Sequence, residues 1–137
     1  MKVFVTGVAG QLGHDVMNEL ASRGYVGVGT DLGESYSGIQ DGTYVTTAEY
    51  VSLDITNSEA VMNTIKSVKP DVVVHCAAWT AVDLAEDEDK QAKVKAINVD
   101  GTQNIANACK EIEMLKQFMS NNHTFEEFTQ LRYPIWY

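Results

Sequence analysis

The glycine-rich turn near the N-terminus has the clearest chemical meaning in this sequence. Gly7, Gly10 and Gly13 recur every three residues, after the apolar run 2–5 and at the start of a segment, 11–23, with helical spacing of apolar residues. Glycine permits a tight turn and close backbone approach, and a helix N-terminus attracts anions through its partial positive charge. The turn predicts a site for the pyrophosphate of a dinucleotide, and a loop that binds nothing is the alternative.

An acidic residue follows at the spacing expected for a ribose contact. Asp31 comes directly after a second strand-like run, 26–30, and lies 18 residues beyond Gly13. A carboxylate there can accept hydrogen bonds from the adenosine ribose hydroxyls, and it repels a 2′-phosphate. The sequence therefore predicts NAD(H) as the favoured cofactor, with NADP(H) as the second choice.

The composition excludes several other classes of partner. The 137 residues carry a formal net charge of −9, and no cluster of Lys and Arg offers the basic surface that nucleic acid or an anionic membrane requires. No apolar stretch approaches the roughly 20 residues of a membrane span, and the N-terminus lacks a signal-peptide pattern. We therefore expect a cytoplasmic protein that binds neither nucleic acid nor membrane.

The residues that most often bind metals are scattered. Cys76 and Cys109 are isolated, so the sequence predicts no metal site and no disulfide, and both cysteines are interpreted as small core residues. His14, His75 and His123 are likewise far apart. They are interpreted as a helix-surface, a strand-end and a loop histidine rather than as catalytic groups.

Four strand patterns alternate with helix patterns. The strands are expected at 2–5, 26–30, 44–53 and 71–77, and the helices at 11–23, at 57–68 and from about 87–90 to 112, with an exposed loop at 32–42. This alternation predicts an α/β fold, a doubly wound parallel sheet in the order 3-2-1-4. Gly101 lies inside the last helix at a cost of about 1 kcal/mol relative to alanine, which predicts close packing there.

Four stretches carry a resemblance to a known family. They are TGVAGQLG at 6–13, LDIT at 53–56, AAWTAVDLAE at 77–86 and AINVDGT at 96–102. Residues 1–112 resemble the cofactor half of an extended short-chain dehydrogenase/reductase, and the third stretch resembles its dTDP-4-dehydrorhamnose reductase branch. The resemblance implies a truncated Rossmann-like domain at 1–112 and a divergent helical and aromatic tail at 113–137, which does not form a separate domain.

The resemblance also implies a role for each candidate site residue. Asp31 would contact the adenosine ribose, and Asp54 with Ile55 the adenine, although Asp54 could instead cap the helix that follows. The pyrophosphate would be lined by Gly7, Gly10, Gln11, Leu12 and Gly13, and the nicotinamide side by Ala77, Ala78 and Thr80. Asn98 and Thr102 would support the sheet from the helix behind it.

The catalytic residues of the family are missing from the sequence. Its chemistry needs a Tyr-x-x-x-Lys pair, in which the lysine lowers the pKa of a tyrosine that acts as acid and base. The residues four positions after Tyr25, Tyr36, Tyr44, Tyr50 and Tyr133 are glycine, glutamine, alanine, aspartate and tyrosine. We therefore predict no catalytic residue in this chain, which alone should be inactive.

Three functional readings follow. The first is the cofactor half of an NAD(P)H-dependent oxidoreductase of dTDP-rhamnose biosynthesis, which reduces a dTDP-4-keto-6-deoxy sugar bound by a missing domain. The second is a non-catalytic dinucleotide-binding or regulatory module, as in the regulatory subunit of methionine adenosyltransferase, a relative of this branch. The third is a fragment that folds without function.

The apolar composition of the tail, residues 113–137, indicates that it covers the sheet edge formed by the strand 71–77. In the order 3-2-1-4 the strand 71–77 lies at an edge, where its unpaired backbone groups would be exposed beside valines. Apolar residues of the tail offer the surface to cover it. These are Phe125, Phe128, Leu131, Ile135 and Trp136. We expect 113–137 to form either an intramolecular cap or a homodimer contact.

Overall fold

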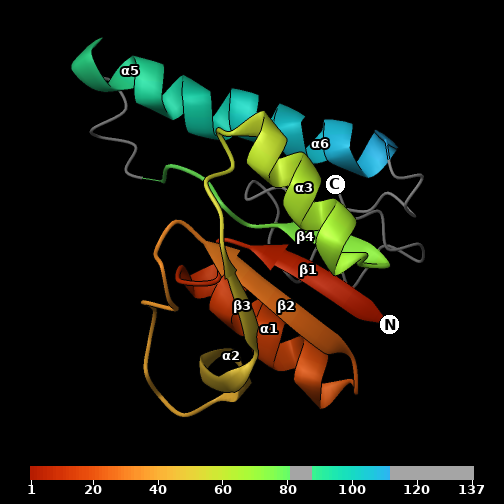
Figure 1. Ribbon diagram of the computed structural model, residues 1–137. Coiled ribbons are helices and arrows are strands. Elements are labelled where there is room, and N and C mark those ends of the chain that lie inside the picture. The colour runs from red at the N-terminus through yellow and green to blue at the C-terminus, as the bar shows by residue number, and fades with distance from the viewer. Residues whose placement is uncertain (81–87, 112–137) are drawn as a thin grey trace, which may run out of the picture.

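The computed structural model describes residues 1–80 and 88–111 and contains a four-stranded parallel sheet (Figure 1). The strands lie in the order β3-β2-β1-β4, as predicted. Their bounds are Lys2–Thr6 for β1, Val26–Asp31 for β2, Glu49–Ser52 for β3 and Val72–His75 for β4. Because β1 lies between β2 and β4, the chain leaves the centre of the sheet first to one side and then to the other. This is the doubly wound topology.

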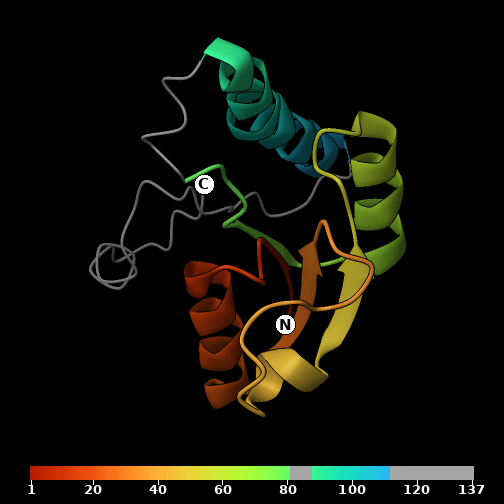
Figure 2. The same cartoon turned by 90° about the vertical axis from the view of Figure 1, so that its left-hand side faces the viewer.

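Helices cover both faces of the sheet (Figures 1 and 2). On one face lie α1 (Gln11–Ser22) and the short α2 (Tyr44–Thr47). On the other face, α3 (Ser58–Val68) packs beside a long helix made of α5 (Glu88–Lys95), a π-helical segment η1 (Ala96–Gly101) and α6 (Thr102–Glu111). The result is three layers, with the sheet in the middle.

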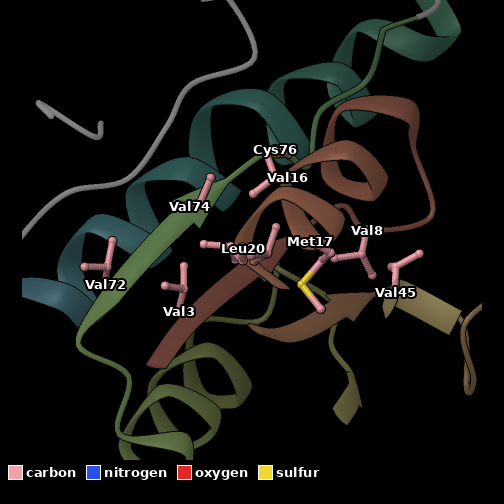
Figure 3. Packing of buried hydrophobic residues seen from close by; sticks show 10 residues of the cluster. Val3, Val8, Val16, Met17, Leu20, Val45, Val72, Val74 and Cys76 are labelled. Carbon is pink, nitrogen blue, oxygen red and sulfur yellow. The ribbon is translucent and has the colours of Figure 1, made fainter. Parts of the chain in front are cut away.

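The alternation of side chains along the strands divides the core into two halves. Val3 and Val5 belong to the buried cluster on the α1 face, which also contains Met17 of α1. Figure 3 shows Val3 and Met17 within this cluster. Phe4, between Val3 and Val5 in the sequence, points to the other face and packs with Ile65 of α3 and Ile105 of α6. Residues of β1 are buried on both faces, as expected of a central parallel strand.

Local signals explain where α3 begins and ends. The side chain of Asn57 caps α3 by accepting a hydrogen bond from the Ala60 N–H at 3.0 Å. At the other end Lys69 adopts a left-handed conformation with φ of 50°, and Pro70 follows. The sequence predicted both ends of this helix.

The predicted strand 44–53 was too long, because its first half is the helix α2. Residues Tyr44–Thr47 have the β-branched and aromatic composition of a strand, but tertiary contacts decide their conformation. The Val45 N–H donates to Asn18 Oδ1 of α1 at 3.1 Å, and the Val45 side chain is 4% exposed against α1. Only Glu49–Ser52 remains as strand β3.

The described part of the last helix begins at Glu88, directly after the residues that the structure leaves undescribed, so its predicted start near 87–90 stays a prediction. Gly101 lies inside this helix and is tightly packed. A Cβ on Gly101 would lie 2.7 Å from Cδ1 of Ile55, so the predicted close approach is confirmed. The π-helical turn Ala96–Gly101 was not predicted. It has no pattern in the sequence beyond the glycine that ends it.

Three further expectations concern burial and the parts of the chain beyond the sheet. Cys76 and Cys109 are both buried in the core, which confirms their interpretation as core residues. Among the described residues, no helix has the length and apolar character needed to cross a membrane. His123, the expected end of the last helix at 112 and the proposed cover from 113–137 fall outside the described ranges, so these remain predictions.

Candidate functional site

A cavity of about 540 Å³ opens at the carboxyl ends of the strands. Its walls come from the turn after β1 and from the segments that follow β2, β3 and β4. All eleven residues predicted from the sequence line it: Gly7, Gly10, Gln11, Leu12, Gly13, Asp31, Asp54, Ile55, Ala77, Ala78 and Thr80. In open parallel sheets this edge is where ligands bind.

Two glycines of the turn after β1 are required by the protein itself. Gly7 has a φ of +73°, and a Cβ on it would lie 2.6 Å from the backbone nitrogen of Ala77. A Cβ on Gly13 would collide with the carbonyl group of Gly7, so α1 can approach β1 only without a side chain there. The turn therefore lies directly against both the helix and Cys76 and Ala77, the two residues that follow β4.

Gly10 differs from these two glycines. A Cβ on Gly10 would meet only the carbonyl oxygen of Gly7, at an ordinary distance of 3.4 Å. Its φ of −82° is also open to any residue. The described protein therefore does not require glycine at this position.

The N-terminus of α1 faces the cavity and is suited to an anion. Gly10 is the N-cap residue, and no side chain among the described residues caps the helix. The first turn of α1 also contains no acidic residue. Exposed N–H groups with the positive end of the helix dipole form the usual cradle for a phosphate, so the residues present fit a pyrophosphate.

Asp31 holds the turn as well as lining the cavity. Its Oδ2 accepts a hydrogen bond from the Ala9 N–H at 3.0 Å, and its Oδ1 accepts one from the Leu32 N–H at 2.8 Å. A carboxylate has about four lone-pair sites, so two further donors can still be accommodated. The sequence predicted that Asp31 contacts a ribose, but it did not predict these hydrogen bonds to the backbone of Ala9 and Leu32.

Asp54 does not cap α3, since Asn57 is the N-cap residue. Instead, Asp54 Oδ1 accepts hydrogen bonds from the N–H and the hydroxyl of Thr56, at 2.9 and 2.7 Å. This local turn leaves Asp54 exposed and part of the cavity wall. The sequence left open whether Asp54 caps the following helix, and the structure shows that Asn57 has this role.

The wall formed by 76–80 is held by hydrogen bonds from side chains. Thr6 Oγ1 accepts from the N–H groups of Cys76 and Ala77, at 3.1 and 3.2 Å. Farther along, Asn98 of η1 accepts from the Trp79 N–H at 2.7 Å and donates to the Trp79 carbonyl at 3.2 Å. Asn98 thus supports the loop after the sheet, whereas Thr102 contacts β4, as predicted, through His75.

Seven cavity residues were missed by the sequence analysis: Thr6, Ala9, Thr30, Leu32, Leu53, Cys76 and Ile97. Six of them flank a predicted site residue, so proximity in the sequence was an available signal, and Ile97 lies in the stretch 96–102 that carries the family resemblance. Burial raises the pKa of the Cys76 thiol to about 12, so Cys76 lines the cavity as an unreactive group. Thr30 Oγ1 is buried without a partner among the described residues.

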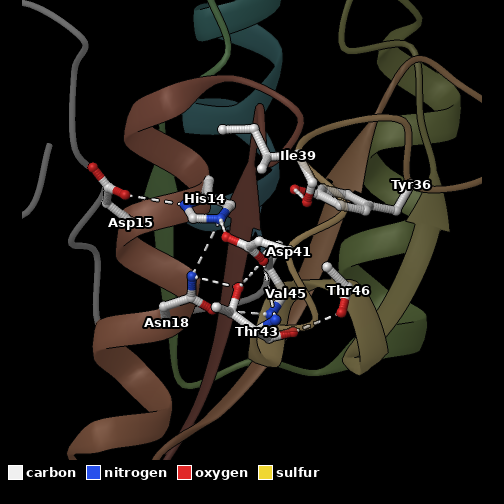
Figure 4. A network of polar contacts seen from close by, with 9 residues as sticks. All are labelled: His14, Asp15, Asn18, Tyr36, Ile39, Asp41, Thr43, Val45 and Thr46. Carbon is white, nitrogen blue, oxygen red and sulfur yellow. Dashed lines mark hydrogen bonds and ion pairs between the residues drawn. The ribbon is translucent and has the colours of Figure 1, made fainter.

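The loop after Asp31 is fastened to α1 by a polar network (Figure 4). Nδ1 of His14, in α1, lies 3.0 Å from Oδ1 of Asp15, and Nε2 of the same ring lies 2.9 Å from Oδ2 of Asp41. The hydrogen bond with Asp15, and then that with Asp41, raises the pKa of His14 above 6.5 against the opposing effect of burial. Hydrogen bonds from Thr43 lower the pKa of Asp41 to about 2.

Fold and cavity together define a Rossmann-like domain of the short-chain dehydrogenase/reductase type. Comparison with solved structures agrees. A dTDP-4-dehydrorhamnose reductase from Clostridium acetobutylicum superposes with a TM-score of 0.66 at 32% identity, covering 88% of this chain and 35% of that one. A UDP-glucose 4-epimerase from Brucella ovis, in complex with NAD, gives a TM-score of 0.72 at 30% identity, covering 87% and 35%.

Sequence comparison places the chain in a family. Residues 1–134 match the family model of the RmlD substrate binding domain, so the chain belongs to that family. It is 35% identical over 121 residues to a dTDP-4-dehydrorhamnose reductase of Streptomyces griseus, which covers 88% of this chain and 33% of the relative. The chain thus spans about a third of the length of the curated relatives it matches.

Proposed function

We propose that the cavity binds a nicotinamide dinucleotide, with NAD(H) favoured over NADP(H). The observation that carries this proposal is the meeting of the uncapped N-terminus of α1 with Asp31 in one cavity. The helix supplies N–H groups for the pyrophosphate, and the free lone pairs of Asp31 supply acceptors for the ribose hydroxyls. Gly10 provides the space for close approach.

We further propose that the domain serves an oxidoreductase that reduces a dTDP-4-keto-6-deoxy sugar. The support is the name shared by the reductases of Streptomyces griseus and Clostridium acetobutylicum. When bound, the cofactor supplies the hydride. The residues of this chain bind and orient it, with 76–80 along the nicotinamide side and Asp54 with Ile55 along the adenine.

A second candidate is a non-catalytic dinucleotide-binding or regulatory module. It is favoured by one observation, that no tyrosine in the sequence is followed four residues later by lysine. On either reading, this chain alone should not oxidise NADH in the presence of dTDP-4-dehydrorhamnose. Turnover near 1 s⁻¹, an ordinary enzyme rate, would exclude the regulatory module and reveal an unrecognised catalytic acid.

The cofactor proposal is tested by titrating NADH and NADPH into the wild type and into Asp31→Asn by calorimetry. Asparagine keeps an oxygen that can accept the Ala9 or Leu32 N–H, whereas alanine would release both. A hydrogen bond to a charged group contributes about 1.5–3 kcal/mol, so NADH should bind the variant about tenfold or more weakly. Without the negative charge, the preference for NADH over NADPH should disappear.

Glu49→Gln is the matched control for this experiment. Glu49 is an exposed acid at the start of β3 that does not line the cavity, so its loss changes net charge by the same amount. The control should bind both cofactors as the wild type does. A wild type that binds no NADH at millimolar concentration, or an Asp31→Asn variant with unchanged preference, contradicts the proposal.

A further inference from the structure

His75 lies beneath the cavity without lining it. It is the last residue of β4, it is 3% exposed, and it sits between the end of β1 and the long helix. Its Nδ1 lies 2.7 Å from Thr6 Oγ1, and its Nε2 lies 3.0 Å from Thr102 Oγ1. The sequence analysis interpreted it only as a strand-end histidine.

The hydrogen-bonding capacity of Thr6 determines what Nδ1 must do. A hydroxyl has one proton and two lone pairs, and Thr6 Oγ1 already accepts from the N–H groups of Cys76 and Ala77. The Cys76 N–H is shared, since it also reaches the Thr6 backbone carbonyl oxygen at 3.2 Å. With both amides donating to Oγ1, the hydroxyl proton is left to donate to Nδ1 of His75 at 2.7 Å, and this arrangement places no proton on Nδ1.

The same count at the other end places the proton on Nε2. The hydroxyl of Thr102 donates to the Asn98 carbonyl at 2.8 Å, so toward His75 its oxygen can only accept. Nε2 is then the donor, and the ring is neutral with its proton on Nε2. This agrees with burial, which lowers the pKa of His75 to about 4.

We propose that His75 is a positioning residue for the cofactor cavity: in its neutral form, with the proton on Nε2, it accepts a hydrogen bond from the Thr6 hydroxyl at Nδ1, so that both lone pairs of Thr6 Oγ1 are turned toward the N–H groups of Cys76 and Ala77. Through Thr102 and the Asn98 carbonyl, the same ring ties this end of β4 to the π-helical turn. The Asn98 side chain in turn holds Trp79. The wall 76–80 is thereby supported at both ends by one continuous set of hydrogen bonds.

Loss of the His75 hydrogen bonds should affect the two halves of the cofactor unequally. The wall 76–80 lies on the proposed nicotinamide side, whereas the glycine turn and Asp31 lie on the ADP side; this step rests on the proposed function. A substitution of His75 that removes its acceptor should therefore lower the affinity for NADH more than the affinity for ADP. Damage to the fold as a whole would weaken both ligands in parallel.

Two variants of His75 separate these outcomes. His75→Asn places an amide oxygen near the position of Nδ1 and keeps an acceptor for the Thr6 hydroxyl. His75→Leu has similar bulk and no acceptor. We expect the affinity for NADH relative to ADP to fall about tenfold in His75→Leu and to stay within about threefold of the wild type in His75→Asn, since one buried unpaired donor has an effect of this size.

Nuclear magnetic resonance of the protein without ligand gives an independent reading. The imidazole nitrogens of His75 should show a protonated Nε2 and an unprotonated Nδ1 at neutral pH. The amide protons of Cys76 and Ala77 should shift in His75→Leu and return toward their wild-type positions in His75→Asn. A proton on Nδ1, or amides that do not respond, overturns the proposal.

The binding and resonance measurements together distinguish a failure of this proposal from a failure of the proposed function. If the wild type binds neither NADH nor ADP, the proposed cofactor site is wrong, and the resonances of His75, Cys76 and Ala77 still decide whether His75 positions the wall. If the wild type binds both ligands and the two variants weaken them equally, the proposed cofactor stands and the positioning role is overturned.

Discussion

The two walls of the cavity nearest β1 are built in different ways. The turn after β1 is fixed by shape, because Gly13 lets the turn pack directly on α1, and Gly7 lets it pack directly on the backbone of Cys76 and Ala77 in the other wall. The segment 76–80 after β4 contains no glycine and is fixed by side-chain hydrogen bonds from Thr6 and Asn98. Steric contacts of the first kind are intolerant of any added atom, whereas a hydrogen bond can be kept by a different side chain with the same donor or acceptor.

The largest effect is expected at the wall that is fixed by shape. Gly13→Ala places a methyl group against the carbonyl of Gly7 and near the Cα of Val8, which are backbone atoms that cannot rotate away. We expect a loss of about 3 kcal/mol or more in the free energy of unfolding, the upper range for overpacking. Chemical denaturation followed by circular dichroism measures it.

Gly10→Ala is the matched control for Gly13→Ala, since it makes the same change three residues earlier. Its Cβ meets only the Gly7 carbonyl oxygen, at 3.4 Å, so stability should fall by about 1 kcal/mol or less, the usual cost of alanine at an N-cap. NADH affinity should nevertheless fall, because the methyl group would occupy space that the proposed pyrophosphate needs. Equal destabilisation by the two variants would show that the turn is not fixed in the way described.

This difference also explains what could be predicted from the sequence. The spacing of the glycines and of Asp31 is visible in the sequence, and the alternation of strand and helix patterns indicated the strand order. The other cavity residues at 54–55 and 77–80 were predicted from the resemblance of 53–56 and 77–86 to a known family. The bonds that hold the other wall join residues far apart, such as Thr6 and His75 at 69 positions and Asn98 and Trp79 at 19. Such pairs have no local pattern, because any threonine, histidine or asparagine can serve once the fold brings it into place.

The helix α2 was mispredicted for a related reason. Residues 44–47 have strand-like composition, but the Asn18 side chain and the apolar surface of α1 hold Val45 in a helical turn. Asp31 shows the same limit inside the site. Its spacing from the glycines indicated a ribose contact, whereas its hydrogen bond to Ala9 depends on the folded turn.

The smallest effect is expected at the loop beside the first wall, where His14 contacts both Asp15 and Asp41. Neutral imidazole has one N–H and can donate to only one of these carboxylates, so both contacts require the protonated ring. Because the pKa of His14 is raised in the folded protein, this contribution to stability is fully present below pH 6.5 and is lost as pH rises through the raised pKa.

Hydrogen exchange measures this loss. Amides of the loop 32–43, corrected for intrinsic exchange rates, should become less protected as pH rises through the pKa of His14, and His14→Gln should remove that pH dependence. Titration of the His14 ring by nuclear magnetic resonance should give a pKa above 6.5, which Asp15→Asn and Asp41→Asn should each lower. A pKa at or below 6.5 in the wild type contradicts this description of the loop.

The central claim, that the cavity at the carboxyl ends of the strands binds NAD(H), is tested most directly by following backbone amide resonances during NADH titration. Saturable shifts should appear at 7–13, at Asp31 and at 76–80, all around the cavity. Amides at the opposite end of the strands, such as Gly24 and Asp71, should not move. No shift at millimolar NADH, or shifts centred on that opposite end, would contradict the account.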